Sequence, residues 1–183
     1  DRSVVAKPRV PFHILPGQTA KVYVSTPLWI EVKVGRALRI LIDIPTRRLS
    51  DTWFGSSTRE GEVAYALKTH ARVRLAEMPV RTYRTITPVV FQNAGTDVLE
   101  VDRMSLPVPY IALYANQEGQ LWTQAVTLKR SEGSEMAELD VKKGPPKEAG
   151  QSQRLSEARL KADANVVVRA FSSLLRSFGE ESA

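Results

Sequence analysis

The stretch that decides the fold class is residues 28–44, which read LWIEVKVGRALRILIDI. Apolar residues occupy every second position over 28–34 and again over 38–44, and a Gly-Arg pair stands between the two runs. Successive side chains of a β-strand point to opposite faces of the sheet, so this period of two predicts two strands joined as a hairpin. The chain is therefore expected to be built from strands.

Alternating segments recur along the rest of the chain, with turn residues such as Asn93–Asp97 and Asn116–Gly119 between them. We expect these strands at 62–76, 85–92, 98–104, 110–114, 121–129 and 137–141. Short strands at a spacing of roughly eight to twelve residues are typical of all-β sandwiches and barrels. The sequence predicts an all-β fold, specifically a β-sandwich of the immunoglobulin-like type.

The composition changes at residues 142–150, KKGPPKEAG, where Pro, Gly and charged residues replace the alternating pattern. Such a composition is typical of a linker. Beyond it, Val167, Phe171, Leu174 and Phe178 have the spacing of one face of an α-helix. We expect a β-sandwich domain at 1–141, a linker at 142–153, and a C-terminal helical segment at 154–183 that packs on the sandwich or on a partner.

Composition excludes several kinds of chemistry. The 183 residues include no cysteine and two histidines far apart in sequence, so neither a thiolate nucleophile nor a Cys- or His-led metal centre is expected, and no cofactor is predicted. The formal charge of +6 favours an acidic partner. No apolar run has the roughly 20 residues of a transmembrane helix, and the first residues do not resemble a signal peptide, so a cytoplasmic location is expected.

Residues 46–62, TRRLSDTWFGSSTREGE, form the candidate site. The pattern predicts a long loop, and long loops in compact β-domains are usually functional when they are ordered. Its arginines carry planar forks that bind carboxylate or phosphate at two points, its acids can orient those forks, and its tryptophan supplies apolar contact area. The predicted ligand-binding residues are Arg47, Arg48, Asp51, Thr52, Trp53, Arg59 and Glu60.

Three other interpretations of this region stay open. The acids of the loop can pair with its arginines while the aromatic residues pin the loop to the domain, which would make the segment structural. Asp51, Glu60 and Glu62 can instead hold an oxygen-ligated metal in a hydrolase-type enzyme. Alternating arginines at 72–84, near Tyr65 and Tyr83, can form a basic strand face that binds single-stranded nucleic acid.

Four segments carry a resemblance to a known family: 44–55, 57–62, the Pro-rich 106–109 and residues 121–123. On these segments the chain resembles an uncharacterised prokaryotic family described only as a domain of unknown function. The resemblance covers most of residues 28–175 and implies that this range is one domain. It also implies a gene sometimes encoded near mechanosensitive-channel genes, and it assigns no activity and no catalytic residue.

The function expected from these observations is a noncatalytic binding or assembly module. We predict that it recognises an anionic group or a partner protein through the 46–62 loop, and that a protein partner or a homo-oligomer is involved. Neither a catalytic residue nor a metal ligand is assigned, because the loop's serines lack the Gly-x-Ser-x-Gly elbow and its arginines lower the pKa of neighbouring carboxylates.

Overall fold

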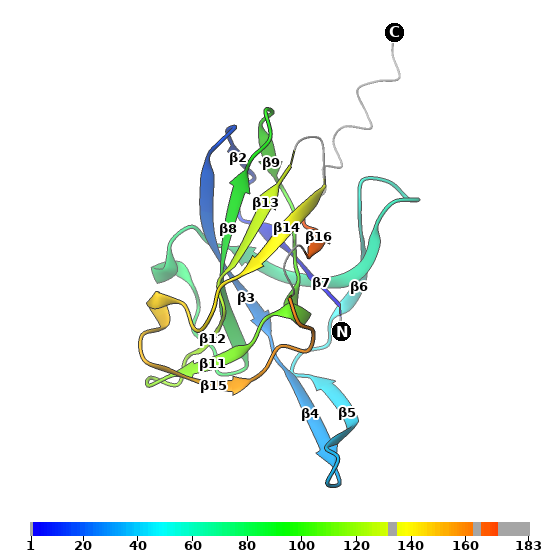
Figure 1. Ribbon diagram of the computed structural model, residues 1–183, viewed down its shortest axis with the longest axis vertical. Coiled ribbons are helices and arrows are strands. Elements are labelled where there is room, and N and C mark those ends of the chain that lie inside the picture. Colours follow the sequence, from blue (N-terminus) through cyan, green and yellow to red (C-terminus); the bar gives the residue numbers. More distant parts are fainter. Residues whose placement is uncertain (1, 132–134, 163–165, 172–183) are drawn as a thin grey trace.

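The computed structural model describes residues 2–131, 135–162 and 166–171, and strands make up most of the regular structure there (Figure 1). The all-β class predicted from the sequence is confirmed. The strands are β1 (Val4–Pro8), β2 (Phe12–Ile14), β3 (Thr19–Pro27), β4 (Trp29–Val34), β5 (Arg39–Pro45), β6 (Ser50–Phe54), β7 (Glu62–Ala71), β8 (Arg84–Asn93), β9 (Leu99–Val101), β10 (Met104–Leu106), β11 (Leu113–Asn116), β12 (Leu121–Thr123), β13 (Val126–Arg130), β14 (Met136–Val141), β15 (Ser152–Ser156) and β16 (Val167–Arg169). Short 3-10 helices are η1 (Leu75–Glu77), η2 (Val108–Tyr110) and η3 (Lys147–Ala149).

Strand β8 is the centre of the larger sheet. It pairs antiparallel with β3 along one edge, and along the other edge it pairs parallel with β12 and then with β13. The sheet continues to β11 and β15 on one side and to β14 and β16 on the other. A second sheet has the order β10-β1-β7-β6, and its β1 and β7 are also parallel. These parallel pairs are absent from hairpin-built sandwiches, and the immunoglobulin-like arrangement is not confirmed.

The main core lies between these strands. Its fully buried side chains include Phe91 of β8, Leu128 of β13, Val24 of β3 and Leu106 of β10. Phe91 has ring contacts with Phe12 and Phe171, at centroid distances of 6.0 Å and 5.8 Å. Both sheets and both ends of the described chain therefore share one hydrophobic core, and this core holds β8 in place.

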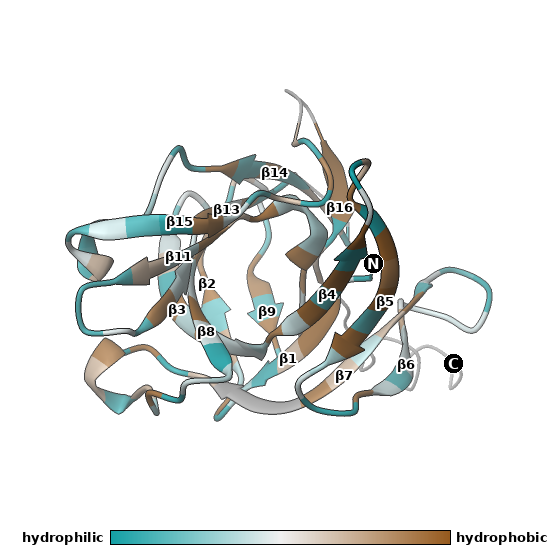
Figure 2. Ribbon diagram, turned by 90° about the horizontal axis from the view of Figure 1, so that it is seen from below, coloured by the Kyte–Doolittle hydropathy of each residue, from teal (hydrophilic) through white to brown (hydrophobic). Residues whose placement is uncertain are grey.

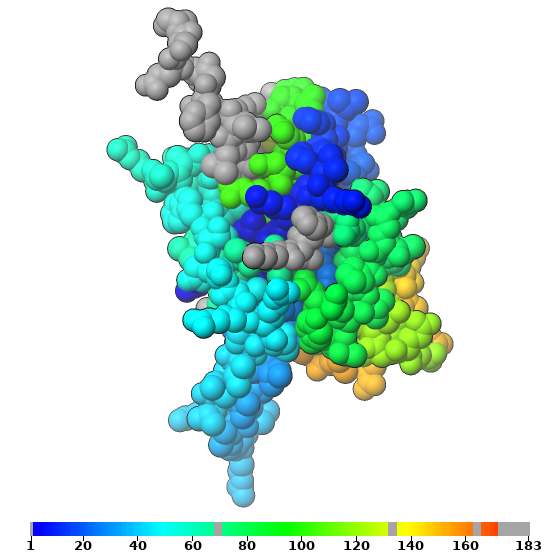
Figure 3. Space-filling model, turned by 180° about the vertical axis from the view of Figure 1, so that it is seen from behind, coloured from blue at the N-terminus to red at the C-terminus, as the bar shows by residue number. Residues whose placement is uncertain are grey.

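Strands β4 and β5 form the hairpin that the alternation at 28–44 predicts, and their pairing is antiparallel. The hairpin projects away from the body of the protein (Figures 1 and 3). Its base lies where β3 ends and β8 begins, at the pair Pro27–Arg84. At the base, the Trp29 ring contacts the Tyr65 ring of β7, with centroids 5.4 Å apart. In the described part of the chain β4 and β5 pair only with each other.

The prediction of a C-terminal helix is wrong for the residues that the structure describes near the C-terminus. Residues Val167–Arg169 form β16, which pairs antiparallel with β14, and Phe171 is buried in the main core. The reason is the run of three valines at 166–168, because β-branched side chains fit an extended strand better than a helix. Within the predicted helical segment 154–183, residues 154–156 belong to β15, and residues 163–165 and 172–183 lie outside the described residues.

The segment predicted as a linker, 142–153, packs against the domain. It contains η3, whose Ala149 is 4% exposed and contacts the Trp122 cluster. It ends in the first residues of β15, and Ser152 and Gln153 pair with Asn116 and Ala115 of β11. The proposed division into three parts stays a prediction.

Candidate functional site at the base of the projecting hairpin

The 46–62 segment is shorter as a loop than the sequence predicts. Its residues Ser50–Phe54 form β6, which pairs with β7, and the short connections 46–49 and 55–61 remain outside strands. Trp53 closes the 55–61 turn, since its Nε1 donates a hydrogen bond of 2.7 Å to the Ser57 carbonyl and its ring covers Gly61, where a Cβ atom would come within 2.6 Å of the indole. Trp53 therefore stabilises its own turn, although its side chain stays 42% exposed.

Strand β6 separates the predicted arginines into two groups. Arg47 and Arg48 precede the strand, whereas Arg59 lies in the turn that follows it. A five-residue strand spans roughly 16 Å, so the backbone of Arg59 is separated from that of Arg47 and Arg48 by the length of β6. All three residues are exposed, and within the described residues no ion pair involves their side chains. The interpretation that the loop's own acids neutralise its arginines therefore does not match this geometry.

The predicted acidic residues have separate surroundings. Asp51 forms an ion pair of 3.0 Å with Arg2, and it lies opposite Tyr65 in the β6–β7 register. Glu60 is exposed in the turn, where its backbone N–H donates to the Ser57 hydroxyl at 3.0 Å. Thr52 lies within β6, opposite Ala64. Among the described residues no group of three or more His, Cys, Asp or Glu side chains is placed to hold a metal ion.

The basic strand face expected from the arginines at 72–84 is not continuous. Strand β7 ends at Ala71, and the chain then turns through η1 before β8 begins at Arg84. The side chain of Arg74 donates to Glu77 at 2.7 Å, which neutralises it locally. Arg84 lies inside the protein and does not face solvent beside the other arginines. The alternating arginines therefore do not form one exposed stripe.

Arg84 is a buried cation without a carboxylate partner among the described residues. The residue is 7% exposed, and its guanidinium donates from Nε to the Ser25 hydroxyl at 2.8 Å and from Nη2 to the Ser25 carbonyl. Arg130, the other arginine in the buried set, is equally covered but donates to both oxygens of Asp97 at 3.1 Å and 3.0 Å. Buried charges in proteins are normally paired, so Arg84 is the exception that requires an explanation.

Two further arginines lie close enough to Arg84 to act on its charge. Burial lowers the pKa of the Arg84 guanidinium most, Arg47 and Arg81 lower it further by charge repulsion, and Tyr83 acts in the opposite direction. Arg81 is exposed and donates from Nη1 to the Tyr83 hydroxyl at 3.1 Å. The cluster of Arg47, Arg81 and Arg84 is named the hairpin-base cluster below. The cluster carries a net positive charge, and its buried member, Arg84, is largely shielded from water.

Backbone hydrogen bonds fix this cluster at the hairpin base. The Leu28 N–H donates to the Tyr83 carbonyl at 3.3 Å, and the Thr46 N–H donates to the Leu28 carbonyl at 2.9 Å. The Thr46 hydroxyl adds a bond of 2.8 Å to the same Leu28 carbonyl. These bonds join the start of β4, the end of β5 and the start of β8. Arg47 therefore follows a fixed residue and does not belong to a free loop.

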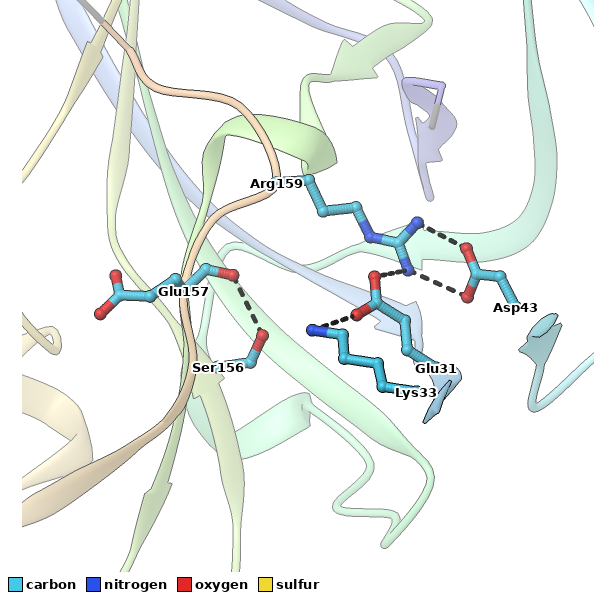
Figure 4. Close-up of polar contacts among 6 residues, drawn as sticks. All are labelled: Glu31, Lys33, Asp43, Ser156, Glu157 and Arg159. Carbon is cyan, nitrogen blue, oxygen red and sulfur yellow. Dashed lines mark hydrogen bonds and ion pairs between the residues drawn. The ribbon is translucent and has the colours of Figure 1, made fainter. Parts of the chain in front are cut away.

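A second contact also holds the hairpin (Figure 4). Arg159 donates to both carboxylate oxygens of Asp43, one of them at 3.0 Å, and it also pairs with Glu31 at 3.0 Å. Glu31 in turn binds Lys33 at 2.9 Å. Glu31 and Asp43 are cross-strand neighbours, so one guanidinium clamps both strands of the hairpin. This contact limits the angles that the hairpin can adopt relative to the body.

The Asp43–Arg159 pair makes a testable prediction about pH. The hydrogen bond from Arg159 lowers the pKa of Asp43 in the folded protein. A carboxylate with a lowered folded-state pKa contributes stability above its unfolded-state pKa, and this contribution is lost as the pH falls through the folded-state pKa. We expect NMR titration of the Asp43 carboxyl to give a midpoint below that of an unperturbed aspartate, and Arg159→Gln to raise it. Equal midpoints in both proteins would contradict the clamp.

A cavity of about 460 Å³ lies elsewhere, between the N-terminal residues, the β6–β7 turn, η2 and β16. Two arginines line it, and each has a carboxylate partner: Arg2 pairs with Asp51 at 3.0 Å, and Arg169 pairs with Glu135. This cavity therefore lacks the unpaired positive charge that distinguishes the hairpin base.

Arg47 belongs to the site predicted from the sequence, Arg81 and Arg84 fall within the predicted nucleic-acid face at 72–84, and Arg159 was not predicted. The signal available for Arg84 was its position at the first residue of a strand that is otherwise buried, where a charged side chain is unusual. Nothing in the sequence indicated that residues 28, 46 and 83 meet.

The fold and the site define a class: an all-β domain with a projecting hairpin and, at its base, a buried arginine that no carboxylate of the described residues pairs with. The chain belongs to the family described as "Protein of unknown function (DUF432)", whose model matches residues 1–176. The resemblance to a family of unknown function is thereby confirmed, while a prokaryotic origin and the gene neighbourhood stay predictions. No curated protein and no solved structure matched the chain.

Proposed function

We propose that this protein is a noncatalytic binding module that recognises an anionic group, and that the hairpin-base cluster is the recognition site. This proposal keeps the Arg47 end of the 46–62 segment and adds Arg81 and Arg84. The observation that supports it best is the pairing of buried arginines: Arg130 has Asp97, whereas no carboxylate among the described residues pairs with Arg84. A bound anion would supply the missing charge.

The surroundings of Arg84 fit this role. Arg47 and Arg81 are exposed, so they can reach a ligand from solvent, while Arg84 supplies a fixed charge that does not need to be desolvated on binding. Guanidinium groups bind carboxylate and phosphate through two parallel hydrogen bonds. The backbone bonds through Leu28 and Thr46 fix the geometry before the ligand arrives.

The first experiment is a calorimetric titration of the full chain with inorganic phosphate, and with sulfate, at low ionic strength. We expect the double variant Arg47→Ala, Arg81→Ala to bind phosphate at least about tenfold more weakly, since each lost charged hydrogen bond contributes about 1.5–3 kcal/mol. Both side chains are exposed, so the thermal unfolding midpoint should change little.

The matched control is Arg59→Ala, which removes an exposed arginine from the far end of β6. We expect its phosphate affinity to equal that of the unmodified chain. An equal loss of phosphate affinity in Arg59→Ala would indicate that the whole 46–62 segment, and not the hairpin-base cluster, forms the site. Absence of phosphate and sulfate binding in the unmodified chain would refute recognition of an anionic group at this site.

A further inference from the structure

The projecting hairpin exposes many large aliphatic side chains to solvent. Eight aliphatic residues of residues 30–44 are between 39% and 70% exposed: Ile30, Val32, Val34, Leu38, Ile40, Leu41, Ile42 and Ile44. Figure 2 shows the corresponding hydrophobic bands on β4 and β5, and Figure 3 shows the hairpin standing out from the body. A contiguous exposed apolar surface of this kind usually marks an interaction site.

The apolar side chains lie on both faces of the hairpin near its turn. Val32 and Ile42 are paired on one face, and the register then shifts, so that Ile40 is opposite Lys33 on the other face. Leu41, at the shift, is 70% exposed. A flat partner would cover only one of these faces. A medium that surrounds the turn would cover both.

The turn itself holds a leucine in an unfavourable conformation. Leu38 has φ of 49°, in the left-handed region that glycine and asparagine tolerate best, and its side chain is 66% exposed. Neither core packing nor backbone geometry calls for a leucine at such a position. A large apolar side chain kept there despite the strain indicates that the side chain itself has a use.

The positive charge near the hairpin turn favours a partner that is negatively charged. Residues 32–42 contain Lys33, Arg36 and Arg39 and no acid. Arg36 and Arg39 are exposed, and within the described part of the chain neither forms an ion pair. The hairpin base is also basic, because the hairpin-base cluster lies there. Pairing of two hairpins from two copies of this chain through residues 32–42 would bring Arg36 and Arg39 of one copy close to those of the other.

We propose that the tip of the hairpin, residues 34–41, inserts into the interfacial region of a membrane that carries anionic lipids. The aliphatic side chains of both faces would enter the boundary of the acyl chains, and Arg36 and Arg39 would meet headgroup phosphates. Insertion is shallow, because a two-stranded hairpin has free backbone N–H and C=O groups along its outer edges that require water. The Arg159 clamp holds the hairpin in a projecting position without the membrane.

This inference goes beyond the proposed function and does not depend on it. The hairpin-base cluster lies at the opposite end of β4 and β5 from the turn, and a substitution at the turn leaves the cluster unchanged. No helix among the described residues is long and apolar enough to cross a bilayer.

The experiment is co-sedimentation of the full chain with vesicles of phosphatidylcholine alone, and of phosphatidylcholine mixed with phosphatidylserine. We expect binding to the mixed vesicles only. Leu41→Asp should lower the fraction bound to them about tenfold or more, because an exposed apolar side chain at the tip is replaced by a negative charge. Leu15→Asp is the matched control, since Leu15 is 59% exposed in the β2–β3 connection, and we expect it to bind as the unmodified chain does.

Leu38→Gly separates the strain from the contact. Glycine accepts the positive φ, so the thermal unfolding midpoint should stay equal or rise, while vesicle binding should fall. Three results would overturn the proposal: equal binding of Leu41→Asp and the unmodified chain, equal binding to both vesicle types, or a dimer in sedimentation velocity without vesicles that Leu41→Asp abolishes. The last result would assign the hairpin to a second copy. Leu41→Asp should keep its phosphate affinity, so a failure of this proposal is distinguishable from a failure of the hairpin-base site.

Discussion

Asp97→Ala is expected to destabilise the protein by about 3 kcal/mol, because it removes the carboxylate that accepts two hydrogen bonds from the buried Arg130 guanidinium. Arg130 lies at the end of β13, is 7% exposed, and donates to both oxygens of Asp97, which follows β8 in the turn toward β9. The value is placed at the low end of the range for broken buried pairs because the Asp97 side chain is 38% exposed. Urea unfolding should show a lower midpoint with an unchanged slope.

A surface ion pair supplies the control for this prediction. Asp140 pairs with Lys142, and their side chains are 57% and 59% exposed, so Asp140→Ala should change the stability by less than about 1 kcal/mol. A second control is the double variant Asp97→Ala, Arg130→Met, which removes the charge together with its partner and should regain part of the loss. Equal effects of Asp97→Ala and Asp140→Ala would show that the Arg130 pair has no special importance.

The strands of this fold could be predicted because their apolar pattern is local. The alternation at 28–44 gave the β4–β5 hairpin with nearly its observed limits, and the turn around residues 93–97 was placed correctly before β9. The sheet order could not be obtained this way. The parallel pairs of β8 with β12 and β13 join segments about 36 residues apart in sequence, as the pairs Ile86–Trp122 and Val89–Val126 illustrate, and no local pattern encodes such a pairing.

Two errors have identifiable physical causes. Residues 165–178 carry apolar residues at both helical and alternating positions, and the valines at 166–168 favour the strand, which β14 then completes. Residues 50–54 were interpreted as loop because Ser50, Asp51 and Thr52 are polar. β6 is nevertheless a strand, since its partner β7 supplies the hydrogen bonds and Phe54 is fully buried. In both places tertiary pairing outweighed the composition of the segment.

One part of the candidate site could be predicted from the sequence and one part could not. The sequence shows an excess of basic over acidic residues between residues 46 and 84, and the three arginines of the hairpin-base cluster all come from this range. It does not show which arginine is buried. That distinction depends on Arg84 being placed beside Ser25 across the β3–β8 pairing, 59 residues away in sequence. Burial distinguishes Arg84 from the exposed arginines around it, and burial is a property of the whole fold.

Arg84→Met, combined with Ser25→Ala, is expected to abolish phosphate binding at the hairpin base while leaving the protein equally stable or more stable by about 1 kcal/mol. Replacing buried charged groups by apolar groups of similar volume is often neutral or stabilising, and the second substitution removes the hydroxyl that Arg84 would leave without its partner. A residue kept for binding at some expense of stability behaves in this way.

Two measurements on the same protein test this prediction, urea unfolding and calorimetric titration with inorganic phosphate. Arg84→Lys serves as the charge-retaining comparison. It should bind phosphate weakly but measurably, because an ammonium group keeps the charge and loses the planar fork. If Arg84→Met with Ser25→Ala destabilises the protein as strongly as Asp97→Ala and keeps its phosphate affinity, Arg84 is a structural residue like Arg130, and the anion site has to be sought among the exposed arginines alone.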